Sequence, residues 1–205
     1  MNTVKLLSAV AITASCVAAS QAVLAYSAGD VFVRGGIAKT EVASDNGSVD
    51  VAGDLDVTDE RGFTYGVGVL VHDKIGIELA GQEKVEHDLS GANTGSLGSV
   101  NRLPFNLMVN YYPLGGLDSK VQPYVGAGLN YTRFTGETVS GLDVDNSYGA
   151  VGQLGIDLAV THNFMLNGFV NYADVDPDVS LSGVGDLGSA KVDPMTIGGG
   201  VTFRF

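Results

Sequence analysis

The sequence predicts an all-β fold, an eight-stranded antiparallel transmembrane β-barrel of the outer-membrane type. Apolar and polar residues alternate with a period of two in segments of about ten residues, the length of a tilted strand that crosses a bilayer. The connections between these segments alternate between long and short. Outer-membrane barrels show the same alternation, because long loops lie outside the cell and short turns face the periplasm.

The composition agrees with a membrane protein. The 205-residue chain is 45% hydrophobic, only 17% charged, and contains 29 glycines. Soluble domains are about 25% charged. The net charge is −12, and no basic stripe is present, so we do not expect nucleic-acid binding.

Residues 1–25 are typical of a secretory signal peptide. Lys5 provides the positive start, an apolar run of small residues follows, and Val23-Leu24-Ala25 fits a small-x-Ala cleavage site. Cleavage after Ala22 is the alternative. The predicted organisation is therefore a signal peptide, 1–25, followed by one barrel domain, 26–205.

Cys16 is the only cysteine, and it lies inside the predicted signal peptide. The mature chain is therefore expected to have no disulfide, thiolate metal site or cysteine nucleophile. Acylation at Cys16 is a less favoured alternative, because Thr13-Ala14-Ser15 matches a lipoprotein processing site poorly.

Eight strands are predicted after the signal peptide. In each strand, one of the two alternating sets of positions (one parity) is apolar. Phe63 and Val67 in the second segment alternate with Thr64 and Gly66, and the last segment ends Val-Thr-Phe-Arg-Phe. No later stretch reaches the ~18 apolar residues that a transmembrane helix needs. In chain order the predicted strands are 30–40, 61–71, 75–83, 102–112, 121–134, 148–160, 164–176 and 192–205.

The second parity is rich in Gly, Asn, Thr and Gln, as the crowded interior of a narrow barrel requires. A soluble barrel is the alternative, but its large apolar side chains would then overfill the lumen. The connections are 41–60, 72–74, 84–101, 113–120, 135–147, 161–163 and 177–191. With both termini in the periplasm, all four long connections lie outside the cell.

Outward aromatic residues fall near both ends of the strands, as in the interfacial girdles of membrane barrels. The outer group is Phe63, Tyr65, Phe105, Tyr131, Tyr148 and Tyr172, and the periplasmic group is Tyr111, Phe164, Phe203 and Phe205.

With these strands in place, the sequence resembles the outer-membrane protein W (OmpW) family. The matching stretches are 28–36, 73–79, Leu103-Pro104, 123–132 (beginning Pro-Tyr-Val-Gly-Ala-Gly), 191–194 and the terminal Phe203-Arg204-Phe205. The resemblance implies an eight-stranded barrel for uptake of small hydrophobic molecules. It also implies an apolar-lined upper channel, a closed periplasmic end and sideways release into the outer membrane. Phe203 and Phe205 resemble the signal that the barrel insertion machinery reads.

Four charged residues share the inward parity toward the periplasmic end: Arg34, Glu78, Asp157 and Arg204. Two cations and two anions can neutralise one another there, because isolated buried charge is costly. We expect Arg34 or Arg204 within salt-bridge distance of Glu78 or Asp157. Such a cluster either plugs the lumen or is the ordinary polar filling of a small barrel.

Inward residues above this cluster are the expected channel lining, with an apolar waist formed by Met108, Val151 and Phe169. The further lining positions are Leu70, Ala80 and Asn171. Pro104 removes one ladder donor in the fourth strand. Either the seam between the third and fourth strands at Pro104 is the lateral exit, or Pro104 is an ordinary strand-end proline without a role in release.

The predicted function is a channel for small hydrophobic molecules. The alternative is a surface interaction or adhesion protein with acidic loops, notably 41–60 and 174–178, and no transport. No catalytic group, cofactor or metal is expected: His87, Asp88 and Ser90 are a weak hydrolase signal, and the acidic loops lack EF-hand spacing. We expect a monomer in the outer membrane of a Gram-negative bacterium, with lipids, hydrophobic molecules and the insertion machinery as partners.

Overall fold

Eight long strands form the wall of the barrel in the computed structural model. They are β1 (Val31–Glu41), β4 (Glu60–His72), β5 (Ile75–Gln82), β7 (Gly95–Tyr111), β8 (Val121–Thr135), β10 (Ser147–Ala159), β11 (Phe164–Ala173) and β14 (Met195–Arg204). The structure describes residues 26–41, 48–49, 53–57, 60–91, 95–135, 142–175, 178–181, 185–189 and 193–205. All eight predicted strands are present, and their ends differ by at most three residues, except that β7 begins seven residues earlier than predicted.

The strands pair antiparallel with their sequence neighbours and close into a barrel. β1 pairs with both β4 and β14, and β7 pairs with β8 from Asn101 opposite Thr135 to Tyr111 opposite Val125. The order around the barrel is therefore β1, β4, β5, β7, β8, β10, β11 and β14. No helix long and apolar enough to cross a membrane occurs in the described part of the chain.

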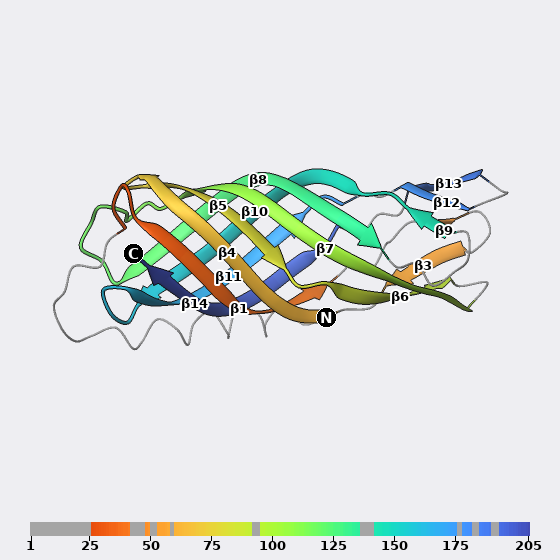
Figure 1. Ribbon diagram of the computed structural model, residues 1–205, viewed down its shortest axis with the longest axis horizontal. Coiled ribbons are helices and arrows are strands. Elements are labelled where there is room, and N and C mark those ends of the chain that lie inside the picture. Colours follow the sequence, from red (N-terminus) through yellow and green to blue (C-terminus); the bar gives the residue numbers. More distant parts are fainter. Residues whose placement is uncertain are drawn as a thin grey trace.

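The two ends of the barrel differ (Figure 1). One end, here called the turn end, carries the turns at 73–74 and 160–163 together with the C-terminus. The opposite loop end carries β2 (Ser48–Val49), β3 (Gly53–Val57), β6 (Val85–Gly91), β9 (Leu142–Val144), β12 (Asp178–Leu181) and β13 (Gly185–Ser189).

These six short strands correct the sequence interpretation, which treated all of 41–60, 84–101, 135–147 and 177–191 as loops. Their backbones pair mainly with one another or with the extension of β7: β6 pairs with β7, and β12 pairs with both β9 and β13. Strands beyond the bilayer do not need a continuous apolar face, so the alternation that reveals a membrane strand is not required of them.

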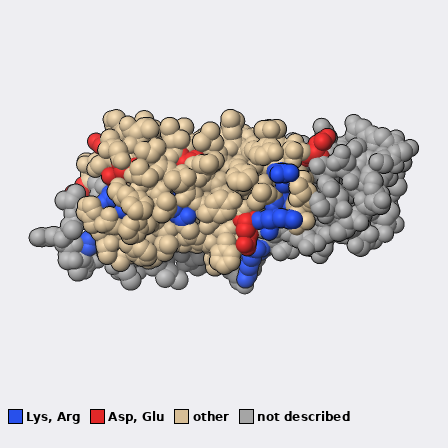
Figure 2. Space-filling model, in the orientation of Figure 1, with Lys and Arg blue, Asp and Glu red and all other residues tan. Residues whose placement is uncertain are grey.

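The outer surface is apolar between the two ends. Side chains of the predicted outward parity are exposed, including Ile37, Phe63, Leu107 and Leu129. The rings of Tyr131 and Tyr148, on neighbouring strands, pack at a tilt of 36° with their centroids 4.8 Å apart. On the face in Figure 2 most of the described surface between the two ends is uncharged, and only a few charged side chains interrupt it.

The interior is filled by two apolar clusters. One consists of Met108, Phe134, Val151, Ala173 and Val175. The second, here called the aromatic layer, lies at the turn end and consists of Tyr26, Phe32, Leu70, Tyr112, Tyr124 and Met165. Inward glycines make room for these rings: a Cβ at Gly68 would overlap Phe32, and one at Gly155 would overlap Tyr124.

We predict that Leu107→Arg lowers the free energy of unfolding in lipid vesicles by about 2–4 kcal/mol. Leu107 is 52% exposed on the band that faces lipid, where a cationic side chain is unfavourable. Urea titration of the refolded protein measures the change, and Leu107→Met is the control, with an effect below about 1.5 kcal/mol. An unchanged midpoint for Leu107→Arg would show that this position does not face hydrocarbon.

Candidate functional site

Arg34 joins two buried carboxylates across the lumen. Its Nη1 donates to Oε2 of Glu78 at 2.7 Å, and its Nη2 donates to Oδ2 of Asp157 at 2.7 Å. The three side chains, from β1, β5 and β10, are only 8%, 3% and 0% exposed. The predicted pairing is thus confirmed for Arg34, and we call these three residues the Arg34 network.

Neutral groups also donate hydrogen bonds to both carboxylates of this network. Glu78 also accepts from Asn110 Nδ2 at 2.6 Å. Asp157 accepts from the Tyr26 hydroxyl at 2.8 Å, from Asn167 Nδ2 at 2.8 Å and from Thr202 Oγ1 at 3.1 Å. These hydrogen bonds support two carboxylates beside one guanidinium, because charged acceptors with good donors offset part of their desolvation.

The aromatic layer closes the turn end beneath the Arg34 network. The guanidinium carbon of Arg34 lies 4.6 Å from the ring centroids of both Phe32 and Tyr124, in the range of cation–π contacts. The Tyr112 hydroxyl accepts from Arg34 Nη2 at 3.1 Å. Polar and aromatic side chains together fill this end of the lumen.

Tyr26 enters the barrel from the segment before β1, and the sequence analysis did not identify it. Its carbonyl accepts from Gly116 N at 2.9 Å, and its side chain is fully buried. Burial and, to a lesser degree, the neighbouring Asp157 raise the pKa of Tyr26 well above its ordinary value. The hydroxyl therefore keeps its proton and donates to Asp157.

Arg204 lies apart from the Arg34 network. Its Nη1 is 3.3 Å from Oδ2 of Asp30, and its Nη2 donates to the carbonyl of His162 at 2.7 Å. The expected cluster of four charges is therefore divided. Arg204 ends the last strand, so its side chain meets the chain entering β1 and the turn at 160–163 instead.

Leu70 was expected among the channel lining, and the structure places it elsewhere. Its side chain is 1% exposed inside the aromatic layer. Leu70 has the inward parity, but it lies two residues before the end of β4, at the turn end, where the lumen is filled.

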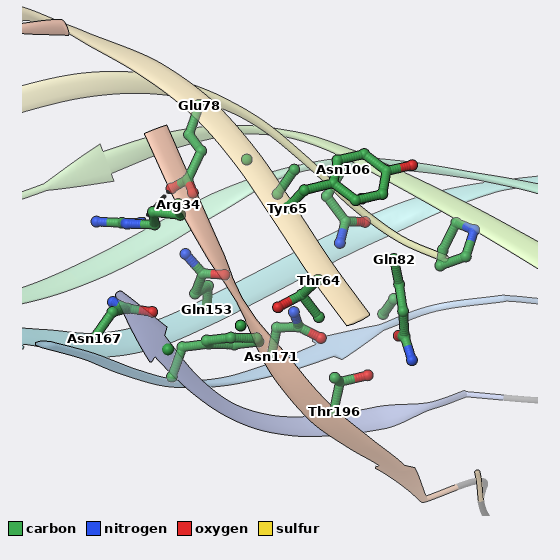
Figure 3. A pocket seen from close by; sticks show the side chains of 18 of the residues that line it. Arg34, Thr64, Tyr65, Glu78, Gln82, Asn106, Gln153, Asn167, Asn171 and Thr196 are labelled. Atoms are coloured by element: carbon green, nitrogen blue, oxygen red, sulfur yellow. Dashed lines mark hydrogen bonds and ion pairs between the residues drawn. The ribbon is translucent and has the colours of Figure 1, made fainter. Parts of the chain in front are cut away.

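A cavity, here called the upper cavity, lies on the loop-end side of the Arg34 network (Figure 3). Arg34 and Glu78 lie at one end of it, and Gln82 and Thr196 lie toward the other. Of the expected lining residues, Ala80, Phe169 and Asn171 are on its wall. The polar side chains around it are Thr64, Gln82, Arg102, Asn106, Asn130, Gln153, Asn167, Asn171 and Thr196.

The upper cavity differs from the expected apolar waist. Met108 and Val151 do not line it but pack with Phe134, and Ala80 leans against them. In a narrow barrel large apolar side chains meet one another across the interior, which leaves amides on the remaining wall. The cavity volume is about 50 Å³, room for a few water molecules.

The ladder on one side of Pro104 is interrupted. β5 pairs with β7 as far as Gly81 opposite Phe105, and pairing resumes with Val85 of β6 opposite Arg102. Residues 82–84 and residues 103–104 are therefore not paired with each other, and we call this interruption in the barrel wall the seam. On the opposite side, Pro104 pairs in register with Thr132 of β8.

The backbone N–H that Pro104 lacks would point toward this seam. Tyr112 N donates to the carbonyl of Lys74, on the β5 side. Donors alternate in direction along a strand, so even-numbered residues of β7 point their N–H groups toward β5. Pro104 also borders the upper cavity, so the seam adjoins the lumen.

Comparison with known proteins identifies one family. The sequence pattern of the OmpW family matches residues 27–205. The chain is 32% identical to outer membrane protein W of Escherichia coli (strain K12), over 91% of this chain and 93% of that protein. The crystal structure of OprG from Pseudomonas aeruginosa superposes with a TM-score of 0.79 at 29% identity, covering 90% of this chain and 99% of that one. The dibenzothiophene metabolism operon protein PahQ of Pseudomonas aeruginosa is 26% identical over 60% of each chain.

We predict that Arg34→Met lowers the free energy of unfolding by about 3–5 kcal/mol, because it leaves two buried carboxylates without their cation. Urea titration in lipid vesicles measures this loss. The control is Lys39→Met, which breaks the half-exposed pair with Glu41 and is expected to change the free energy by less than about 1 kcal/mol. Equal effects of the two substitutions would contradict a structural role for the Arg34 network.

Proposed function

Because the chain belongs to the OmpW family, we propose that this outer-membrane barrel is a channel for small hydrophobic molecules. In this proposal the termini face the periplasm, the Arg34 network and aromatic layer block passage to that side, and cargo leaves sideways into the membrane. The observation that carries the proposal is the pairing of a filled turn end with an unpaired seam beside the upper cavity.

The filled turn end supports lateral release. Opening a direct route would require separating Arg34 from both carboxylates and displacing the aromatic layer. Exposing those buried charges without partners is strongly unfavourable. A ligand that enters from the loop end therefore has an easier exit where strand pairing is already absent.

The seam supports the position of that exit. Widening it breaks no ladder hydrogen bond between residues 82–84 and 103–104. The upper cavity is too small for an aromatic hydrocarbon as it stands, so separation at the seam would enlarge it during passage. The name of PahQ, which refers to dibenzothiophene metabolism, supports an apolar aromatic cargo.

The rival proposal is a surface interaction protein whose acidic loops bind partners. Most of the residues concerned, in 41–60 and 174–178, lie outside the described side chains. Transport tests separate the two functions, because a binding platform does not need an accessible lumen.

We predict that Asn106→Trp reduces uptake of dibenzothiophene about tenfold or more in cells that carry the protein, relative to cells without it. Asn106 lies on the wall of the upper cavity, and an indole there fills the space. The matched control is Leu107→Trp, the same substitution one residue along on the lipid face. Heat-modifiable gel mobility verifies that both variants fold. Uptake that is independent of the protein would favour the surface interaction function.

We predict that Pro104→Ala slows uptake of dibenzothiophene about fivefold. One added hydrogen bond contributes ~1 kcal/mol, which corresponds to a change in rate of that size. The new N–H faces the seam and can pair with the carbonyl of Gln82, which narrows the exit. Pro113→Ala, in the connection after β7, is the control and should leave the rate unchanged. Wild-type uptake by Pro104→Ala would place the exit elsewhere.

A further inference from the structure

Arg102 is a buried cation with no ion-pair partner among the side chains that the structure describes. It precedes Pro104 by two residues, lines the upper cavity and is 4% exposed. Its Nε has no hydrogen-bond partner. The ion pairs of the described side chains join Arg34 to Glu78 and Asp157, Lys39 to Glu41, and Arg204 to Asp30, and none includes Arg102.

Arg34, in the same lumen, is a buried guanidinium that has several hydrogen-bond acceptors. Arg34 has two carboxylates, the Tyr112 hydroxyl and Thr202 Oγ1 as acceptors. Arginine stays protonated, so burial of Arg102 without an anion is unfavourable and loss of its charge does not relieve it. An anionic ligand would supply the missing partner.

The surroundings of Arg102 limit the class of that anion. Among the described residues that line the upper cavity, Glu78 is the only acid, and Arg34 and Asn110 already occupy its Oε2. Among the described lining residues Arg34 is the other cation, and Glu78 and Asp157 neutralise it. A single available guanidinium suits a monoanionic carboxylate, with its planar fork, better than a phosphate dianion.

The remainder of the ligand would be apolar. Phe134 is opposite Arg102 in the register of β7 and β8, and both side chains face inward. Phe134 belongs to the apolar cluster with Met108 and Val151. The seam begins one residue beyond Arg102. A cation therefore adjoins an apolar surface and the unpaired seam in the barrel wall.

We propose that Arg102 binds the carboxylate of amphipathic monoanions, such as aryl or alkyl carboxylates, while their apolar part lies against the Phe134 cluster and the seam. This inference rests on the proposed channel function and names one substrate class for it. Arg102 then selects anionic hydrophobic molecules over neutral ones of the same shape.

Calorimetric titration of the full protein in lipid nanodiscs tests this selection with 2-naphthoate and its neutral analogue 2-naphthylmethanol. Empty nanodiscs correct for partition into lipid. We expect wild type to bind 2-naphthoate at least about tenfold more tightly than the alcohol, and Arg102→Gln to abolish that preference. The matched control is Arg133→Gln, an exposed arginine of β8, which should keep the preference. Absence of the preference in wild type, or its survival in Arg102→Gln, would overturn the proposal.

Urea unfolding without ligand provides a second readout. If Arg102 has no partner, Arg102→Gln should have an equal or higher unfolding midpoint than wild type. A lower midpoint, or failure to fold, would show that Arg102 is structural and would also overturn the proposal. The channel function fails separately, if naphthalene enters cells equally well with and without the protein.

Discussion

The structure depends on one arginine that holds two carboxylates across a narrow lumen. Arg34 connects β1 with β5 and β10, and through Thr202 with β14, so four strands that are not all neighbours are joined inside the barrel. An eight-stranded barrel is just wide enough for its own side chains to fill it. The charges are stable there because each carboxylate is paired with Arg34 and also receives hydrogen bonds from neutral donors, which offset part of the cost of burial. The aromatic layer packs beneath them on the turn-end side.

This constraint divides the lumen into two parts with different properties. The turn end is filled by paired charges and rings, whereas the loop-end side has a small cavity with amide walls and Arg102, whose Nε has no hydrogen-bond partner among the described residues. The ladder also stops beside that cavity, at residues 82–84 and 103–104. A small cavity, an apolar contact surface and the unpaired seam therefore lie together above the filled turn end, as the proposed lateral transport requires.

Much of this could be predicted from alternation alone. Lipid outside and polar filling inside force a period of two, so the eight strands and the inward direction of Arg34, Glu78 and Asp157 followed directly. Packing inside the barrel could not be predicted the same way: Met108 and Val151 meet Phe134 instead of lining a channel, and Leu70 joins the aromatic layer. Tyr26 precedes the first strand and has no periodic signal. Arg102 lies two residues before Pro104 and therefore has the same inward parity. Extending the list of inward positions from Pro104 back to residue 102 would have identified it.

The most direct measurement of the central claim, that the Arg34 network closes the lumen, is the accessibility of a single thiol above it. Asn171→Cys places a thiol on the wall of the upper cavity. Silver ions are added to one side of vesicles that contain oriented protein lacking residues 1–25, and the unreacted thiol is then labelled with a maleimide after solubilisation. If the Arg34 network closes the lumen, silver protects the thiol when it is added at the loop end and leaves the thiol fully reactive when it is added at the turn end. Equal protection from both sides would contradict a closed lumen.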